Sequence, residues 1–173
     1  MSGARSRRRL GLTPHPGAVA RGPRTRPGER LLEVGPGTGF YTLPVAQWLG
    51  SDGQLGICDL QQEMLDHALR TARRRGLSNV TATQSDARNL PYADARFDGA
   101  YLITVLGEIP DQRTALGELS RVLRPGGRLV VGLFGEPHFV SAPALQRQAE
   151  QAGLRLEWRS GPPFGYFARL TPA

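Results

Sequence analysis

The sequence predicts an α/β fold built on a mostly parallel sheet. Short apolar segments that suit buried strands alternate with segments whose apolar residues follow helical spacing. The first apolar segment, residues 31–34, breaks into a glycine-rich loop, residues 35–39, and a helix-like segment follows at once. Such a strand-to-helix turn lets the backbone approach a ligand closely and presents unpaired helix N–H groups to it. We therefore expect a ligand site at this loop.

The second expected strand, residues 54–59, ends in an acid that lies 20 residues beyond Gly39. A helix at 42–49, stopped by Gly50, connects the glycine loop to this strand. Because such crossovers are right-handed, the carboxyl end of the second strand should lie beside the glycine loop. There the Asp59 carboxylate can accept hydrogen bonds from both hydroxyls of a ribose. The alternative role of Asp59 is to cap the next helix.

The rest of the chain continues the alternation of strands and helices. We expect helices at 61–75, 112–122 and 142–152, and strands at 79–84, within 94–103, and at 128–134, 154–158 and 164–170. Asp98 should fall at the amino end of its strand, where it would serve as a structural partner away from any chemistry.

Charge divides the chain into a tail and a body. The net charge is +7, and the seven arginines before Glu29 account for it, since 15 basic residues and 15 acids remain. Residues 1–28 are rich in Gly, Pro and Arg and show no period, so we expect a basic, disordered tail before one domain at 29–173. This arginine-rich tail, or arginine arm, could bind nucleic acid, although a tail that is simply solvated is favoured.

Several classes of protein are not indicated. The single cysteine, Cys58, excludes an intramolecular disulfide and fits a reducing cytoplasm. The sequence has no apolar run of 18 residues, so no membrane span is expected. His15 and His138 have no partners at ligand spacing, so no metal site is expected.

The glycine loop resembles that of the class I S-adenosylmethionine-dependent methyltransferases. Their pattern E/D-x-G-x-G-x-G is met by Glu33, Gly35, Gly37 and Gly39, whereas a dinucleotide fingerprint would place the third glycine one residue later. Residues 85–87, Ser-Asp-Ala, are similar to the family's adenine loop, and residues 123–127, Leu-Arg-Pro-Gly-Gly, to its turn before the fifth strand. The resemblance implies a Rossmann-like seven-stranded, mostly parallel sheet with helices on both faces and a C-terminal antiparallel β-hairpin.

The resemblance also implies S-adenosylmethionine as the cofactor and assigns residues to it. They are Glu33, Gly35, Gly37, Gly39 and Tyr41 at the methionine end, Asp59 and Leu60 after the second strand, Asp86 and Ala87 at adenine, and Thr104 beside the transferring methyl group. Two alternatives stay open: Tyr41 packs under the loop, and Asp86 caps a turn.

Glu108 is the candidate catalytic residue. It stands where many relatives have a histidine, so the role of that histidine does not transfer to it. A buried acid with a raised pKa could orient an acceptor and take its proton, and a salt-bridged structural role is the alternative.

The implied activity is methyl transfer to a small-molecule acceptor by direct in-line displacement. The alternatives are an RNA or protein methyltransferase that uses the arginine arm, and a non-catalytic module with the same fold. Relatives generally carry helices before the first strand that cover the cofactor, and residues 1–28 look too irregular to form them. We therefore expect an open pocket with weak cofactor binding unless a second subunit of a homodimer covers it.

Overall fold

The expected α/β fold is confirmed by a computed structural model, which describes residues 25–135 and 137–173. Seven strands form one sheet: β1 (Arg30–Val34), β2 (Gln54–Asp59), β3 (Val80–Gln84), β4 (Phe97–Ile103), β5 (Leu123–Phe134), β6 (Leu154–Ser160) and β7 (Gly165–Pro172). The helices are α2 (Thr42–Leu49), α3 (Gln62–Arg74), the 3₁₀ turn η2 (Leu106–Glu108), α4 (Gln112–Val122) and α5 (Ala142–Gln151). The helices expected at 42–49 and 112–122 have the expected bounds.

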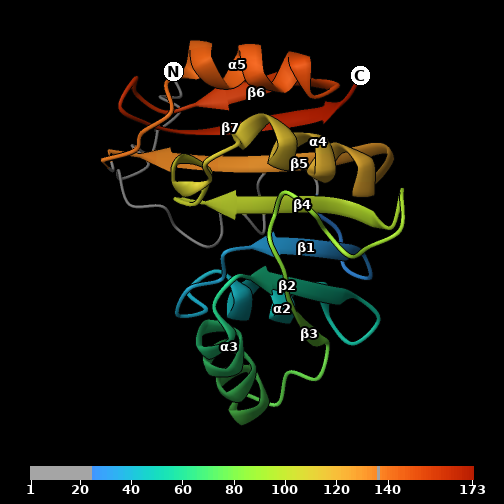
Figure 1. Cartoon of the computed structure of the whole chain (residues 1–173). Helices are drawn as coiled ribbons and strands as arrows, with labels where there is room; N and C mark the ends of the chain where they lie inside the picture. Colours follow the sequence, from blue (N-terminus) through green and yellow to red (C-terminus); the bar gives the residue numbers. More distant parts are fainter. Residues whose placement is uncertain (1–24, 136) are drawn as a thin grey trace, which may run out of the picture.

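The strand order is β3-β2-β1-β4-β5-β7-β6, and β7 alone runs against its neighbours (Figure 1). The predicted seven-stranded sheet and its C-terminal hairpin of β6 and β7 are therefore confirmed. The chain moves outward from β1 to β3 and then returns to place β4 on the other side of β1. The order thus reverses between β1 and β4, which is where ligands bind in open α/β sheets, outside the carboxyl ends of the strands.

Helices cover both faces of the sheet because successive strand residues point to opposite sides. Leu31 packs with the apolar residues of α2 and α3, whereas the next residue, Leu32, packs with those of α4 and α5. Two apolar cores result, one on each face. Between them lies the sheet, and β1, β2, β3 and β4 all end at its carboxyl edge, which we call the rim.

The turn expected at 123–127 lies inside β5 rather than before it. Phe97 pairs with Leu123 and Gly99 pairs with Arg128, so four residues of β5 bulge out opposite one residue of β4. Proline has no N–H for the ladder, and Gly126 has a φ of 74°. The residues typical of a turn thus make a bulge, and the strand already starts at the end of α4.

The amino edge of the sheet is tied by Asp98. Its carboxylate accepts hydrogen bonds from the Arg30 amide at 2.7 Å and from Nε of Arg124 at 2.5 Å. Asp98 is therefore a structural partner away from the carboxyl edge, as expected.

Most of the predicted tail, residues 1–24, lies outside the described residues. The remaining four residues of the predicted tail are fixed against α2. The Trp48 indole N–H donates to the Thr25 carbonyl at 3.3 Å, and the Gly28 amide donates to the Leu49 carbonyl at 2.9 Å. Residues 25–28 thus belong to the folded domain. Among the described helices, none has the length and apolarity that crossing a membrane requires.

Candidate functional site

The glycine loop leaves the carboxyl end of β1 with three residues in the left-handed region. The φ angles are 72° at Gly35, 51° at Gly37 and 84° at Gly39. The Gly35 amide donates to the Cys58 carbonyl at 2.8 Å, which ties the loop to the end of β2. Residues with a Cβ rarely adopt this backbone conformation, so the sequence needs glycine at each of the three positions.

The space around the three glycines differs. A Cβ on Gly35 would lie 2.4 Å from Cγ2 of Val105, so this glycine lets the chain after β4 pack on the loop. A Cβ on Gly39 would make ordinary contacts with Ala68 of α3, whereas a Cβ on Gly37 would meet nothing within 4 Å. Gly37 is therefore the glycine whose open side suits the close approach of a ligand.

Alanine substitutions at these two positions should differ in their effect on stability. Gly35→Ala combines the left-handed backbone with overlap on Val105, so it should lower the free energy of unfolding by about 3 kcal/mol. Gly37→Ala carries the backbone cost alone, about 1 kcal/mol. Urea unfolding of both variants tests the contrast, and equal losses would contradict the packing role of Gly35.

Glu33 is buried directly before the glycine loop. The Thr42 hydroxyl, at the start of α2, donates to its carboxylate at 2.5 Å. Burial raises the pKa of Glu33 to about 7, against the lowering effect of the Thr42 bond. The buried Tyr101 hydroxyl also lowers this pKa, although it makes no hydrogen bond of standard geometry to any described residue. Glu33 thus changes charge near neutral pH.

Glu33 should make stability depend on pH. The unfolded chain ionises this carboxyl near pH 4.5, whereas the folded protein keeps it protonated up to about pH 7. Because the native state binds the extra proton, the free energy of unfolding should fall as the pH rises through this window, by at most about 3 kcal/mol. Glu33→Gln removes the titration. The free energy of unfolding of the variant, relative to that of the wild type, should therefore be higher at pH 8 than at pH 5. Urea unfolding at both pH values tests this, and a pH-independent difference would contradict it.

Tyr41 follows the glycine loop and is partly buried. Its ring meets the exposed Phe40 ring edge-on at a centroid distance of 5.1 Å and packs against the core under α2 and α3. Burial, followed by the nearby Glu33 charge, raises its pKa to about 12. Packing at the loop, the alternative given for Tyr41, is therefore present.

Asp59 ends β2 at the same edge. One carboxylate oxygen, Oδ1, accepts the Gln61 amide at 2.9 Å, and Oδ2 accepts no hydrogen bond from the described residues. Asp59 therefore shapes the turn before α3, whose N-cap residue is Gln61. The remaining acceptor positions leave the carboxylate able to bind a second donor. Leu60 beside it is 63% exposed, so its side chain is available to a ligand.

Asp86 follows β3, and its loop is tied to the end of β2, since the Ser85 amide donates to the Asp59 carbonyl at 3.0 Å. The Asp86 carboxylate accepts the Arg88 amide at 2.8 Å, which is the turn-capping role given as its alternative. It also forms an ion pair with the Arg88 guanidinium, whose hydrogen bonds lower the pKa of Asp86 to about 2. The Ala87 side chain is buried in the core, so only its backbone is available to a ligand.

The chain after β4 is strained. Thr104 has a φ of 60°, which costs a β-branched residue on the order of 1–3 kcal/mol. Its amide donates to the Gly132 carbonyl at 2.8 Å, and its hydroxyl donates to the Ile103 carbonyl at 2.6 Å. These bonds hold Thr104 exposed at the carboxyl edge of the sheet.

Glu108 was expected to be a buried acid, and it is exposed. It lies on η2, just after the carboxyl end of β4, but its side chain is exposed. None of the ion pairs among the described residues includes Glu108, so the salt-bridged role given as the alternative is not observed there either.

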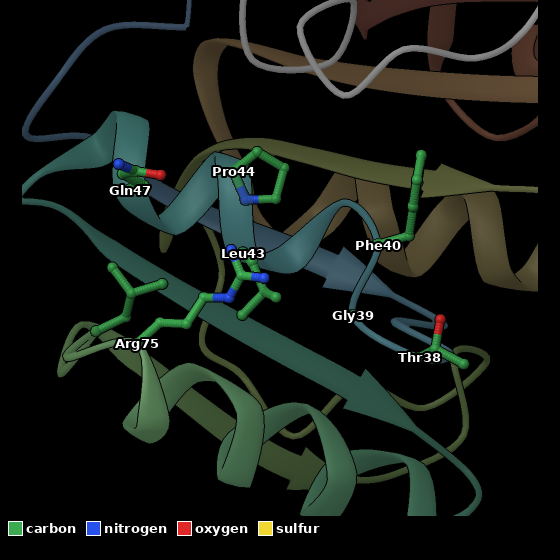
Figure 2. Close-up of a pocket in the computed structure, with 8 residues that line it drawn as sticks. Thr38, Gly39, Phe40, Leu43, Pro44, Gln47 and Arg75 are labelled. Carbon is green, nitrogen blue, oxygen red and sulfur yellow. The ribbon is translucent and has the colours of Figure 1, made fainter.

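A hollow of about 600 Å³ lies beside the glycine loop, on the side of α2 and α3 (Figure 2). Thr38 and Phe40 stand at its loop end, and Gln47 and Arg75 stand at the far end of α2 and α3. Of the residues predicted to bind the cofactor, only Gly39 lines it. The hollow is therefore separate from the rim where the other predicted residues gather.

The described part of the chain contains no group of three or more His, Cys, Asp and Glu side chains that could hold a metal ion.

Comparisons with known proteins decide the family. Residues 31–127, more than half of the chain, match the family profile described as "Methyltransferase domain". The chain belongs to this family. This places it in the class I S-adenosylmethionine-dependent methyltransferase family. The match covers the glycine loop, Asp59, Asp86 and Glu108.

Two curated relatives of this methyltransferase are named ubiquinone/menaquinone biosynthesis C-methyltransferase UbiE. The protein from Teredinibacter turnerae is 38% identical over 113 residues, which cover 65% of this chain and 45% of the relative. The protein from Cellvibrio japonicus is 38% identical over 114 residues, with 65% and 46% coverage. The matched region thus spans less than half the length of these relatives.

Solved structures share the fold. A SAM-dependent methyltransferase from Aquifex aeolicus has a TM-score of 0.84 at 23% identity, covering 91% of this chain and 89% of that one. The [4+2]-cyclase SpnF has a TM-score of 0.76 at 30% identity, covering 84% and 58%. Since the second is named for a different reaction, the fold of this methyltransferase does not by itself fix its chemistry.

The residues predicted to bind the cofactor lie at or just after the carboxyl ends of β1, β2, β3 and β4, at one edge of the sheet. Sequence reasoning missed two of their partners, Arg88 and Thr42. Arg88 lies two residues after Asp86, a spacing at which a long side chain can fold back on an Asp, so the sequence did contain a local signal. Thr42 had a helical signal but none for its bond to Glu33.

Proposed function

We propose that this methyltransferase transfers the methyl group of S-adenosylmethionine to an electron-rich carbon of a small aromatic acceptor. The observation that carries the proposal is the convergence of Gly37, Asp59 and Asp86 at the carboxyl ends of β1, β2 and β3, beside the point between β1 and β4 where the strand order reverses. The acceptor class is suggested by the relatives named as C-methyltransferases.

The residues at the rim fit the parts of this cofactor. The open side of Gly37 leaves room for the methionine portion against the loop backbone. Asp59 keeps acceptor positions for ribose hydroxyls, and the Asp86 loop offers a carboxylate and backbone groups to adenine. Glu33, buried behind the loop, supplies negative charge toward a positively charged ligand when it ionises.

When bound, the cofactor supplies an activated methyl group on a sulfonium sulfur. In the reaction the methyl–sulfur bond breaks as the methyl–carbon bond forms, and the acceptor carbon then loses a proton. The chain's main contribution is alignment, for which effective molarities on the order of 10⁵–10⁸ M are available. Thr104 and η2 border the rim after β4, so we place the acceptor against them. Glu108 stays our candidate for orienting the acceptor.

A labelling experiment tests this function. The protein is incubated with S-adenosylmethionine that carries a labelled methyl group, and with phenols, reduced naphthoquinones, RNA or protein as acceptors. We expect label on a carbon of a small aromatic acceptor, with none when Asp59→Ala replaces the wild type. Label on RNA or protein instead would contradict the proposed acceptor class. An acceptor that is converted to an unlabelled product, while S-adenosylmethionine keeps its methyl group, would indicate a different reaction.

Glu108 has its own test in this assay. Glu108→Gln should lower kcat while the affinity for S-adenosylhomocysteine stays unchanged, because the residue is proposed to meet the acceptor and not the cofactor. The exposed Glu150→Gln on α5 is the control. Unchanged kcat in Glu108→Gln would remove Glu108 from the reaction.

A further inference from the structure

We propose that Arg88 is a positioning residue that holds the Asp86 carboxylate so that its one unfilled acceptor position faces the amino group of the cofactor's adenine. This inference rests on the proposed function, since it assigns a role within the same cofactor site. Arg88 lies outside the pattern of glycines and acids that marks the site in the sequence.

The Asp86–Arg88 contact is side-on and bidentate. Nε of Arg88 donates to Oδ1 at 3.0 Å, with a second leg to Oδ2 at 3.1 Å, and Nη2 donates to Oδ2 at 2.6 Å. The Arg88 amide donates to Oδ1 at 2.8 Å. One residue therefore grips the carboxylate through both its backbone and its side chain.

Most of the acceptor positions of the Asp86 carboxylate are filled by Arg88. A carboxylate offers about four lone-pair positions, two on each oxygen. Three N–H groups of Arg88 reach the carboxylate: the amide bonds Oδ1, Nη2 bonds Oδ2, and the single Nε–H is shared between the two oxygens. Three protons on four positions leave one position that can accept a further donor. Adenine carries such a donor in its exocyclic amino group.

The backbone around Asp86 is already fixed, so the side chain is the part left to be oriented. The Asn89 amide donates to the Asp86 carbonyl at 2.9 Å, and the Ser85 hydroxyl donates to the Asn89 carbonyl at 2.9 Å. Holding the carboxylate in advance removes part of the ordering cost that ligand binding would otherwise carry.

Asp111, a second acid whose charge acts on Arg88, does not replace Asp86 as its partner. Asp111 also acts on the Arg88 charge, but its own oxygens accept the amide and hydroxyl of Thr114 at 3.0 and 2.7 Å. Asp111 caps α4 in this way. The guanidinium therefore has its close contact with Asp86.

The size of the effect follows from exposure. The side chains of Arg88 and Asp86 are 40% and 30% exposed, so solvent screens the ion pair and its contribution is modest. We expect Arg88→Met to weaken the binding of S-adenosylhomocysteine by about three- to tenfold. Arg88→Lys keeps the charge but loses the bidentate geometry, so it should lie between wild type and Arg88→Met.

The experiment compares two ligands by calorimetric titration: S-adenosylhomocysteine and its analogue with hydrogen in place of the adenine amino group. If Arg88 acts through Asp86 on that amino group, Arg88→Met should weaken the first ligand and leave the second unchanged. The control is Arg147→Met, which changes an exposed arginine on α5, next to β6 at the opposite edge of the sheet from β3. It should bind both ligands like the wild type.

Three other outcomes would contradict the inference. Equal loss for both ligands in Arg88→Met, unchanged affinity, or tighter binding of S-adenosylhomocysteine would overturn the positioning role. The melting temperature of Arg88→Met shows whether an equal loss comes from damage to the fold. If the wild type binds neither ligand, the proposed function itself falls, and the inference falls with it.

Discussion

Replacing Arg128 by Met is expected to lower the free energy of unfolding by about 3–5 kcal/mol. Arg128 and Glu29 form an ion pair across 99 residues of sequence, and their side chains are only 11% and 13% exposed. Nη1 of Arg128 donates to Oε1 of Glu29 at 3.1 Å, and its Nη2 donates to Oε2. Removing the guanidinium leaves a nearly buried carboxylate whose one remaining donor among residues 25–135 and 137–173 is the Arg26 amide. Urea unfolding at pH 7 measures the loss.

A double variant separates the ion pair from the loss of packing. Glu29→Gln together with Arg128→Met leaves no unpaired charge, so it should be more stable than Arg128→Met alone. A loss below about 1 kcal/mol in Arg128→Met would show that the pair does not hold the start of β1 against β5.

Replacing Asp59 by Ala is expected to weaken the binding of S-adenosylhomocysteine by at least about 100-fold. Two hydrogen bonds from ribose hydroxyls to a charged acceptor contribute about 1.5–3 kcal/mol each, so their loss amounts to two orders of magnitude or more. The carboxylate is placed for this role, since among the described residues its one hydrogen-bond donor is the Gln61 amide, on Oδ1. Calorimetric titration of wild type and variant measures the change.

Asp59→Asn is the matched variant, because its amide oxygen can still accept the Gln61 amide and so keep the turn before α3. It should fold with near wild-type stability and still lose most of the affinity. Asp52→Asn changes an exposed acid in the turn before β2 and should bind normally. Wild-type affinity in Asp59→Ala would remove Asp59 from the cofactor site.

The parts of the fold that could be predicted from the sequence have local signals. The helix at 42–49 is bounded by the glycine loop and Gly50, and the helix at 112–122 begins after a capping Asp111. The glycine spacing and the distance to Asp59 are local too, so the carboxyl edge could be located before the structure was known. Right-handed crossovers then fix the order of the first strands.

The features that could not be predicted depend on distant or strained parts of the chain. The pairing of Glu29 with Arg128 joins the residue just before β1 to the fifth strand, and no local pattern marks it. Thr104 adopts a backbone conformation that its residue type disfavours, so propensity argues against the observed structure there. The exposure of Glu108 follows from how η2 packs after β4, which residue type alone does not reveal.

The position of the cofactor is tested most directly by titrating S-adenosylhomocysteine into isotope-labelled protein and following the backbone amide resonances. Binding at the carboxyl edge should shift the amides of Gly37, Leu60 and Ala87, which lie after β1, β2 and β3. Shifts confined to the hollow between α2 and α3, at residues such as Gln47 and Leu77, would contradict this placement. The absence of any shift at millimolar ligand would contradict cofactor binding itself.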